Sequence, residues 1–120
     1  CISSAASDVY KRQRIDGVMV GRAAYQTPWM LSEVDSVLYG ESCRTLTREA
    51  VIAAVEAEVE QYYAADEHVT RAFARHLNGL CQGLSGARVW RRTLADPKII
   101  KAEGPNLYRR AWREAFGTDF

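Results

Sequence analysis

Residues 15–28 read IDGVMVGRAAYQTP, an apolar run that ends on a glycine and an arginine. The run at residues 15–20 predicts a buried parallel strand, and Gly21 predicts a tight turn into the start of a helix. Backbone N–H groups at such a junction can hold a phosphate, to which Arg22 could add a charged fork. Gly21 could equally make the turn alone, with Arg22 in solvent. A lone strand forms no sheet, so the predicted strand needs partners that these residues do not supply.

The composition is that of an ordinary globular protein. Of 120 residues, 48% are hydrophobic and 26% are charged, and no apolar run reaches the roughly 20 residues that span a bilayer. No basic-then-apolar start resembles a signal peptide. Cys1, Cys43 and Cys81 are odd in number and far apart, which argues against a disulfide framework or a zinc site. We therefore expect a reduced, cytoplasmic setting, with no metal and no membrane.

The first thirteen residues stand apart from the rest. Residues 8–13 read DVYKRQ, which resembles a translated transposase-end sequence used in DNA library preparation. Residues 1–13 are therefore expected to be a non-native lead-in and are excluded from the fold argument. The alternative is a natural polar loop rich in serine and alanine. Under either interpretation Cys1 is a poor candidate for catalysis.

Beyond the junction, the spacing of apolar residues predicts a series of short helices. They are expected at residues 23–26, 28–39, 47–62, 69–80, 87–94 and 105–116. Thr27 and Ser85 are placed to cap helix N-termini, and Gly40 to end one in the left-handed conformation. Helix 47–62 opens at Thr47.

Apolar stripes on these helices predict a bundle. Val51, Val55, Val59 and Tyr62 make one stripe, and most of the tryptophan and tyrosine side chains fall at core spacing. Four amphipathic helices with short loops favour a small antiparallel arrangement. The polar connector at residues 41–44 separates two predicted parts: residues 14–42, which end an α/β unit, and residues 43–120, a helical domain.

The net charge of +1 hides an asymmetry. Residues 1–69 carry a formal charge of −5, and residues 70–120 carry +6. Arg88, Arg91 and Arg92 share one helix face, and further basic side chains lie on the neighbouring helices: Arg71, Arg75, His76, Arg109, Arg110 and Arg113. Such rows could contact the phosphates of a folded RNA, which is recognised largely by shape and backbone. The alternative is a charged, solvated bundle surface.

Two motifs carry a family resemblance. IDGVMVGRAAYQTPW at residues 15–29 and RHLNGLCQGLSGARVWRR at residues 75–92 resemble the C-terminal part of bacterial tRNA-dihydrouridine synthases, in particular the subfamily labelled A. The resemblance runs from about residue 15 to about residue 94. Asn78, Cys81 and Ser85 depart mildly from the usual pattern, where larger apolar residues or proline are commoner.

The resemblance implies a fold and a role for each part. This chain would be mostly α: the last βα unit of an FMN-binding TIM (β/α)8 barrel, followed by a small C-terminal helical bundle that grips tRNA. Gly21 and Arg22 would belong to the loop that binds the FMN phosphate. The side chains expected to contact tRNA are Arg75, Arg88, Arg91 and Arg92.

The reaction of the family indicates which catalytic residues to look for in this chain. NADPH reduces FMN, the flavin passes a hydride to C6 of a D-loop uridine, and a cysteine protonates C5 to give 5,6-dihydrouridine. That cysteine lies upstream of the residues here, so no catalytic residue is expected in this chain, which should be inactive alone and part of a monomeric enzyme. One alternative is a stand-alone helical RNA-binding module, and another is the phosphate site of some other barrel enzyme.

Overall fold

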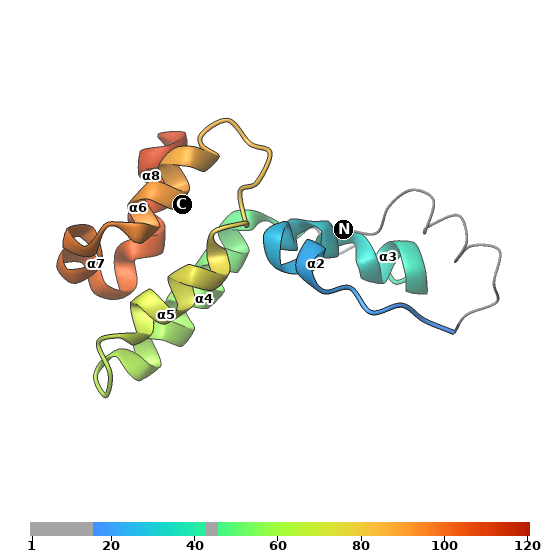
Figure 1. The fold of residues 1–120 in the computed structure, drawn as a ribbon, viewed down its shortest axis with the longest axis horizontal. Coiled ribbons are helices and arrows are strands. Elements are labelled where there is room, and N and C mark those ends of the chain that lie inside the picture. The colour runs from blue at the N-terminus through green and yellow to red at the C-terminus, as the bar shows by residue number, and fades with distance from the viewer. Residues whose placement is uncertain (1–15, 43–45) are drawn as a thin grey trace.

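The computed structural model describes residues 16–42 and 46–120 and measures 52 × 30 × 29 Å. Two parts are visible in Figure 1. The arm, residues 16–42, contains α2 (Arg22–Gln26), the 3-10 helix η1 (Pro28–Glu33) and α3 (Val34–Tyr39). The bundle, residues 46–120, contains α4 (Arg48–Tyr63), α5 (Val69–Leu77), α6 (Ala87–Ala95), α7 (Pro97–Glu103), η2 (Gly104–Asn106) and α8 (Leu107–Phe116).

The core of the bundle is built around two large side chains, Trp90 and Tyr108, which are fully buried. Trp90 Nε1 donates a hydrogen bond to the carbonyl of Leu77 at 2.9 Å, and the Tyr108 hydroxyl donates to the carbonyl of Thr70 at 2.7 Å. Both polar atoms are thereby satisfied, as buried groups require. Trp90 also meets Trp112 edge to face, with ring centroids 6.4 Å apart. These contacts fasten α5, α6 and α8 together.

The strand predicted at residues 15–20 is not formed. Residue 15 lies outside the described residues, residues 16–21 are irregular, and the described ranges contain no strand at all. Val18, Met19 and Val20 are 59%, 84% and 44% exposed. An isolated strand leaves its backbone N–H and C=O groups without a partner, so an extended segment here needs neighbours to become a sheet.

The arm follows the predicted helices only in part. Residues 23–26 are helical as expected, within α2, and Gly40 ends α3 with a left-handed φ of +66°. The single helix predicted over residues 28–39 is instead divided into η1 and α3, and Thr27 makes no side-chain cap. No residue of these three elements is fully buried. Trp29 of η1 packs against the bundle core, whereas Val37, Leu38 and Tyr39 of α3 are exposed, so little packing holds residues 28–39 to one continuous α-helix.

In the first bundle helix, α4, the predicted start is confirmed and one residue of the predicted apolar stripe is wrong. Thr47 Oγ1 accepts a hydrogen bond from the Ala50 backbone N–H at 3.2 Å, which caps α4. The buried residues of α4 are Ile52 and Val59, whereas Tyr62 is 52% exposed. The predicted stripe was therefore wrong at Tyr62, because the face that meets α5 and α8 is centred nearer to Ile52.

The later helices differ from prediction in three places. First, α5 ends at Leu77, and a run of turns occupies residues 78–86. Second, Gly86, with φ +104°, precedes α6, and no side chain caps this helix, so the cap predicted at Ser85 is absent. Third, α7 was not predicted. Asp96 Oδ1 accepts a hydrogen bond from the Lys98 backbone N–H at 2.9 Å and caps α7. The sequence Asp96-Pro97 is a common helix start, so this helix could have been predicted.

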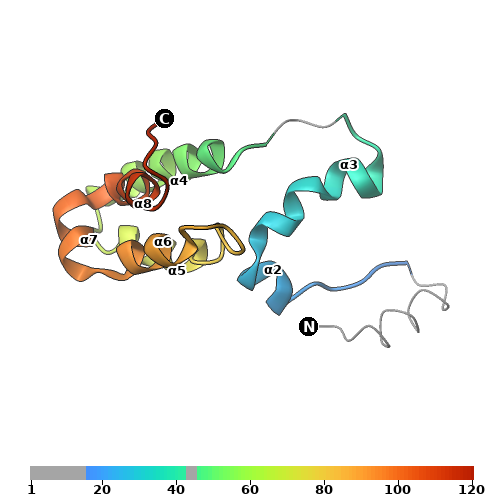
Figure 2. The ribbon, with the colours of Figure 1, turned by 90° about the horizontal axis from the view of Figure 1, so that it is seen from above.

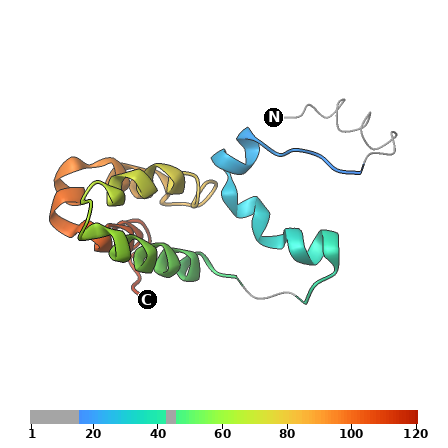
Figure 3. The same ribbon diagram turned by 90° about the horizontal axis from the view of Figure 1, so that it is seen from below.

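The two parts stand in a simple arrangement. In Figures 2 and 3 the arm leaves the bundle at the end where α4 begins and where the chain between α5 and α6 turns back. The opposite end of the bundle is closed by α7. The predicted domain boundary next to residue 43 and the predicted lead-in at residues 1–13 fall on or beside residues that the structure does not describe.

Candidate nucleic-acid interface

A cavity of about 660 Å³ lies where the arm meets the bundle. The end of α2 forms one wall, through Tyr25 and Gln26, and the other walls come from α5, the following turn and α6. Arg75 and Arg91 both line it, together with the amides of Asn78 and Gln82. The structure thus brings two of the four arginines predicted to bind tRNA into one site.

Contacts on both sides hold this cavity in shape. The Tyr25 hydroxyl donates to the carbonyl of Arg75 at 3.4 Å, and the Tyr25 ring meets His76 edge to face at 5.8 Å. Arg91 Nη1 donates to Gln82 Oε1 at 3.0 Å. The guanidinium of Arg91 keeps further N–H groups beyond this bond, since arginine has five.

Gly79 sets the distance between the arm and the bundle. A Cβ atom at this position would lie 2.2 Å from the carbonyl oxygen of Gln26 and 3.0 Å from Pro28 Cδ. Only glycine allows the two backbones to approach so closely. Nearby, the Arg48 guanidinium lies 4.3 Å from the ring centroid of Trp29, and Arg48 Nε donates to the carbonyl of Leu80 at 2.9 Å.

A smaller cavity of about 150 Å³ continues along α5. Arg75 and Asn78 line both cavities, and Arg71 joins them in the smaller one, opposite Ala95 of α6. We call the two cavities together the α5 groove. Arg88 and Arg92 are exposed on α6 but line neither cavity. Arg71 was named in the basic rows but not among the four side chains expected to contact tRNA, although its i, i+4 spacing to Arg75 places both on one face.

The arginines of the bundle divide into two groups. Those of α8 are occupied: Arg109 pairs with Glu56 at 2.9 Å, while Arg110 pairs with Glu103 and Glu114, each at 2.9 Å. The hydrogen bond that Arg109 donates to Glu56 raises the pKa of Arg109, and the one that Arg110 donates to Glu114 raises the pKa of Arg110. Among the described residues, no ion pair or hydrogen bond engages the guanidinium groups of Arg71, Arg75, Arg88 and Arg92. The bundle arginines that remain for a polyanion therefore lie on α5 and α6.

Gly21 and Arg22 lie in the arm, at the start of α2. Both are exposed, and a Cβ on Gly21 would touch only the Met19 side chain, at 3.4 Å. Turn N–H groups and a guanidinium suit a phosphate chemically. These two residues therefore suit the phosphate end of FMN.

Of the three cysteines, Cys81 lies among the described residues. Cys81 is a buried free thiol, and burial raises its pKa to about 11. Cys1 and Cys43 lie outside the described residues. Within the described ranges, no three His, Cys, Asp or Glu side chains gather as a metal site would require. No described helix is both long and apolar enough to cross a bilayer.

Comparison with known proteins places the chain in a family. The profile of the family described as Dihydrouridine synthase (Dus) matches residues 2–116. The chain therefore belongs to the dihydrouridine synthase family, as the motifs at residues 15–29 and 75–92 predicted. The matched range also includes residues 2–13, for which a non-native origin stays a prediction.

Individual relatives narrow the likeness to one kind of bacterial enzyme. The chain is 48% identical over 104 residues to the tRNA-dihydrouridine(20/20a) synthase of Shewanella oneidensis, covering 84% of this chain and 30% of the relative. It is 37% identical over 99 residues to that of Vibrio vulnificus, covering 82% and 30%. It is 40% identical over 84 residues to that of Escherichia coli K12, covering 70% and 24%. The chain spans less than a third of the length of these curated relatives. No solved structure matches it.

Proposed function

We propose that the chain is the C-terminal part of a tRNA-dihydrouridine synthase, which reduces a D-loop uridine of tRNA to 5,6-dihydrouridine with NADPH as the reductant and FMN as the carrier. Family membership and the names of the relatives support this activity for the whole protein. Within it, the bundle binds tRNA and the arm completes the flavin-binding barrel. We place the protein in the cytoplasm, where tRNA is modified, and expect the whole enzyme to be a monomer.

The arm would contribute a small part of the flavin site. Gly21 and Arg22 would hold the FMN phosphate through backbone N–H groups and a guanidinium. The flavin, when bound, supplies the hydride chemistry, and the protein supplies orientation and charge. Cys81 is buried in the bundle core and cannot meet a substrate base. We therefore expect residues 1–120 alone to reduce no uridine.

The observation that carries the RNA-binding role is the unequal pairing of the arginines. On α8 they are engaged by carboxylates of the same chain, whereas Arg71, Arg75 and Arg91 line the α5 groove without a carboxylate partner among the described residues. A guanidinium without a counter-ion favours phosphate oxygens, which it can contact through two parallel N–H bonds. The groove is therefore a better surface for an RNA backbone than α8.

Direct binding tests this role. The full-length chain carrying Arg75→Ala or Arg91→Ala should bind tRNA about fivefold more weakly than the unsubstituted chain does. The slope of log affinity against log salt concentration should fall by about one. Arg110→Ala is the matched control, because its guanidinium is already paired, and it should change affinity less than twofold. Equal losses for the groove and α8 variants would refute the groove as the tRNA site.

The second candidate function is a stand-alone RNA-binding module without catalysis. Its support is the bundle itself, which carries a basic groove and a buried core without the arm. The length of the gene and the activity of its product distinguish the two functions. A longer reading frame that yields FMN-dependent uridine reduction favours the synthase, whereas a product confined to these helices, active in tRNA binding alone, favours the module.

A further inference from the structure

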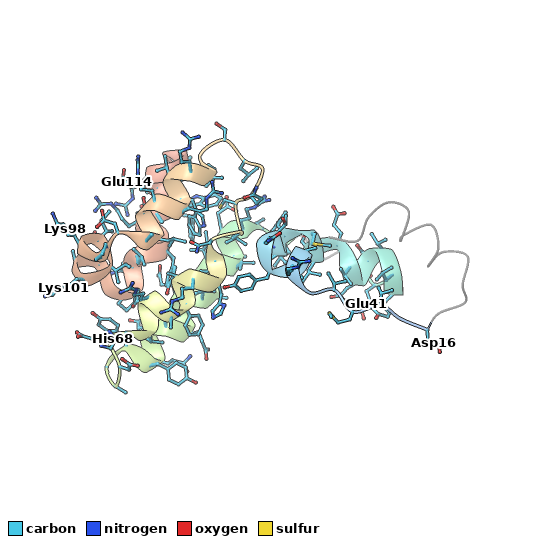
Figure 4. All side chains as sticks on the ribbon, viewed as in Figure 1. Asp16, Glu41, His68, Lys98, Lys101 and Glu114 are labelled. Carbon is cyan, nitrogen blue, oxygen red and sulfur yellow. The ribbon has the colours of Figure 1, made fainter. Side chains whose placement is uncertain are left out.

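A third cavity, of about 230 Å³, lies at the end of the bundle farthest from the arm. The loop between α4 and α5 forms one side, and α7 forms the other. Five side chains with polar heads line it: Tyr63, Glu67, His68, Arg71 and Lys101. In Figure 4, His68 and Lys101 lie at this end of the molecule. We call this cavity the end pocket.

Local backbone features fix the walls of the end pocket. Gly104 has a φ of +54°, and a Cβ there would lie 3.0 Å from Cζ of the Tyr63 ring, so the ring packs directly on the glycine backbone. Asp66 Oδ1 accepts from the backbone N–H of His68 at 2.9 Å, which holds the loop as it enters α5. The start of α7 is fixed by its aspartate cap and by Pro97. Such a pocket exists before any ligand arrives.

The charge of the end pocket suits an anion. Arg71 and Lys101 bring two formal positive charges, and the His68 imidazole offers a further nitrogen donor. Glu67 is the one carboxylate that lines the pocket, so the net charge stays positive. No ion pair with a described residue engages Arg71 or Lys101. Two cationic heads and a phenol within one small hollow match the oxygens of a phosphate group.

The end pocket is continuous with the α5 groove. Arg71 and Ile100 line both the end pocket and the middle cavity, and Arg75 and Asn78 line both the middle cavity and the one beside the arm. From His68 to Asn78 the chain rises about 15 Å along the axis of α5 at 1.5 Å per residue. One track of cationic side chains therefore runs from the arm to α7.

We propose that the end pocket binds a phosphate of the RNA backbone and forms the far end of the tRNA-binding track, with Lys101 and Arg71 as its charged contacts. The proposal rests on the proposed function, because it assigns an additional site to the same ligand. The sequence pattern alone points to neither Lys101 nor His68, because the loop and α7 meet only in the folded bundle.

A pair of lysines on α7 tests the end pocket. Lys101 lines it, whereas Lys98, one turn earlier and also exposed, does not; both are labelled in Figure 4. In the full chain, Lys101→Ala should weaken binding of unfractionated bacterial tRNA about fivefold and lower the salt slope by about one. Lys98→Ala removes the same charge from the same helix and should change affinity less than twofold. Glu67→Gln should strengthen binding, because it removes the one negative charge of the pocket.

Each outcome decides the proposal. Circular dichroism first establishes that the variants keep the helical content of the parent chain. Equal affinities for Lys101→Ala and Lys98→Ala overturn the end pocket, while losses at Arg75→Ala and Arg91→Ala would leave the groove standing. A titration with inorganic phosphate, followed through the His68 ring signals by NMR, distinguishes a phosphate of the RNA backbone from a free phosphate ion. If Lys101→Ala abolishes those shifts and leaves tRNA affinity unchanged, the pocket holds a free anion and the proposal fails.

Discussion

The arm and the bundle are built from the same kinds of residue and end in different states. In α3 of the arm, Val37, Leu38 and Tyr39 are 72%, 69% and 74% exposed. In the bundle, Ile52, Trp90 and Tyr108 are fully buried. Both parts have helical spacing of apolar side chains, so amphipathic pattern does not distinguish them. What differs is that the bundle contains both sides of its own interface, whereas these apolar residues of α3 are left exposed among the described residues.

The largest expected contrast comes from removing a core side chain. Trp90→Ala deletes a fully buried indole and its bond to the Leu77 carbonyl, and should cost about 3–5 kcal/mol in the free energy of unfolding. Leu38→Ala in the arm should cost under about 0.5 kcal/mol, because Leu38 is exposed. Urea denaturation followed by far-ultraviolet circular dichroism measures both. Similar losses would mean that the arm is packed as the bundle is.

The next effect concerns the joint between the two parts. Gly79→Ala places a Cβ 2.2 Å from the Gln26 carbonyl oxygen, and should weaken docking of the arm by about 1–3 kcal/mol. Hydrogen exchange of the α2 amides should accelerate while the amides of α6 keep their protection. Gly17→Ala is the control, since no atom lies within 4 Å of its added Cβ. Unchanged α2 exchange in Gly79→Ala would contradict the close approach.

A smaller effect compares two threonines that precede helices. Thr47 accepts a hydrogen bond from Ala50 and caps α4, whereas Thr27 precedes η1 without a side-chain bond. Thr47→Ala should therefore cost about 1 kcal/mol in thermal or urea unfolding. Thr27→Ala should cost nothing measurable. A loss at Thr27 as large as that at Thr47 would show that the arm has a working cap.

The smallest effect at neutral pH belongs to Cys81. Burial raises the pKa of this thiol from 9.0 to about 11, so the unfolded chain releases the proton first as pH rises. Its contribution to stability is full below pH 9 and should be lost progressively up to about pH 11. Urea unfolding at several pH values should show a steeper decline in the parent than in Cys81→Ala. Parallel declines would mean that the thiol is not buried in solution.

Most helices of residues 46–120 could be predicted from the sequence, because their signals are local. The cap at Thr47 and the inward Tyr108 and Trp112 follow from the residue and its near neighbours, and so does the left-handed Gly40 in the arm. The helix α7 was not predicted, although Asp96 and Pro97 are typical residues of a helix start. The strand at residues 15–20 failed for another reason. A strand is stabilised by its neighbours, and no pattern within one segment can supply them.

The candidate site could be predicted only for residues whose spacing along one helix determines which face they share. Arg75 and Arg91 follow from helical periodicity and from the family motif, and Arg71 could have been added from its i, i+4 relation to Arg75. The pairing of Arg110 with Glu114 is likewise local, at i, i+4. By contrast, Arg109 meets Glu56 across 53 residues, and α7 meets the loop at His68 across about 30. Such contacts exist only after the chain has folded.

The turn that follows α5 has a consequence for the order of folding. No residue at positions 78–80 has a positive φ, so α5 ends without a left-handed glycine of its own. Instead, Trp90 of α6 donates to the Leu77 carbonyl and Arg48 of α4 donates to the Leu80 carbonyl. The turn also has local backbone bonds, such as that from the Leu80 N–H to the Leu77 carbonyl at 3.1 Å. The bond from Arg48 spans 32 residues and forms only once α4 has packed. We therefore expect the contact of this turn with α4, and with it the part of the α5 groove nearest the arm, to form after the local turns.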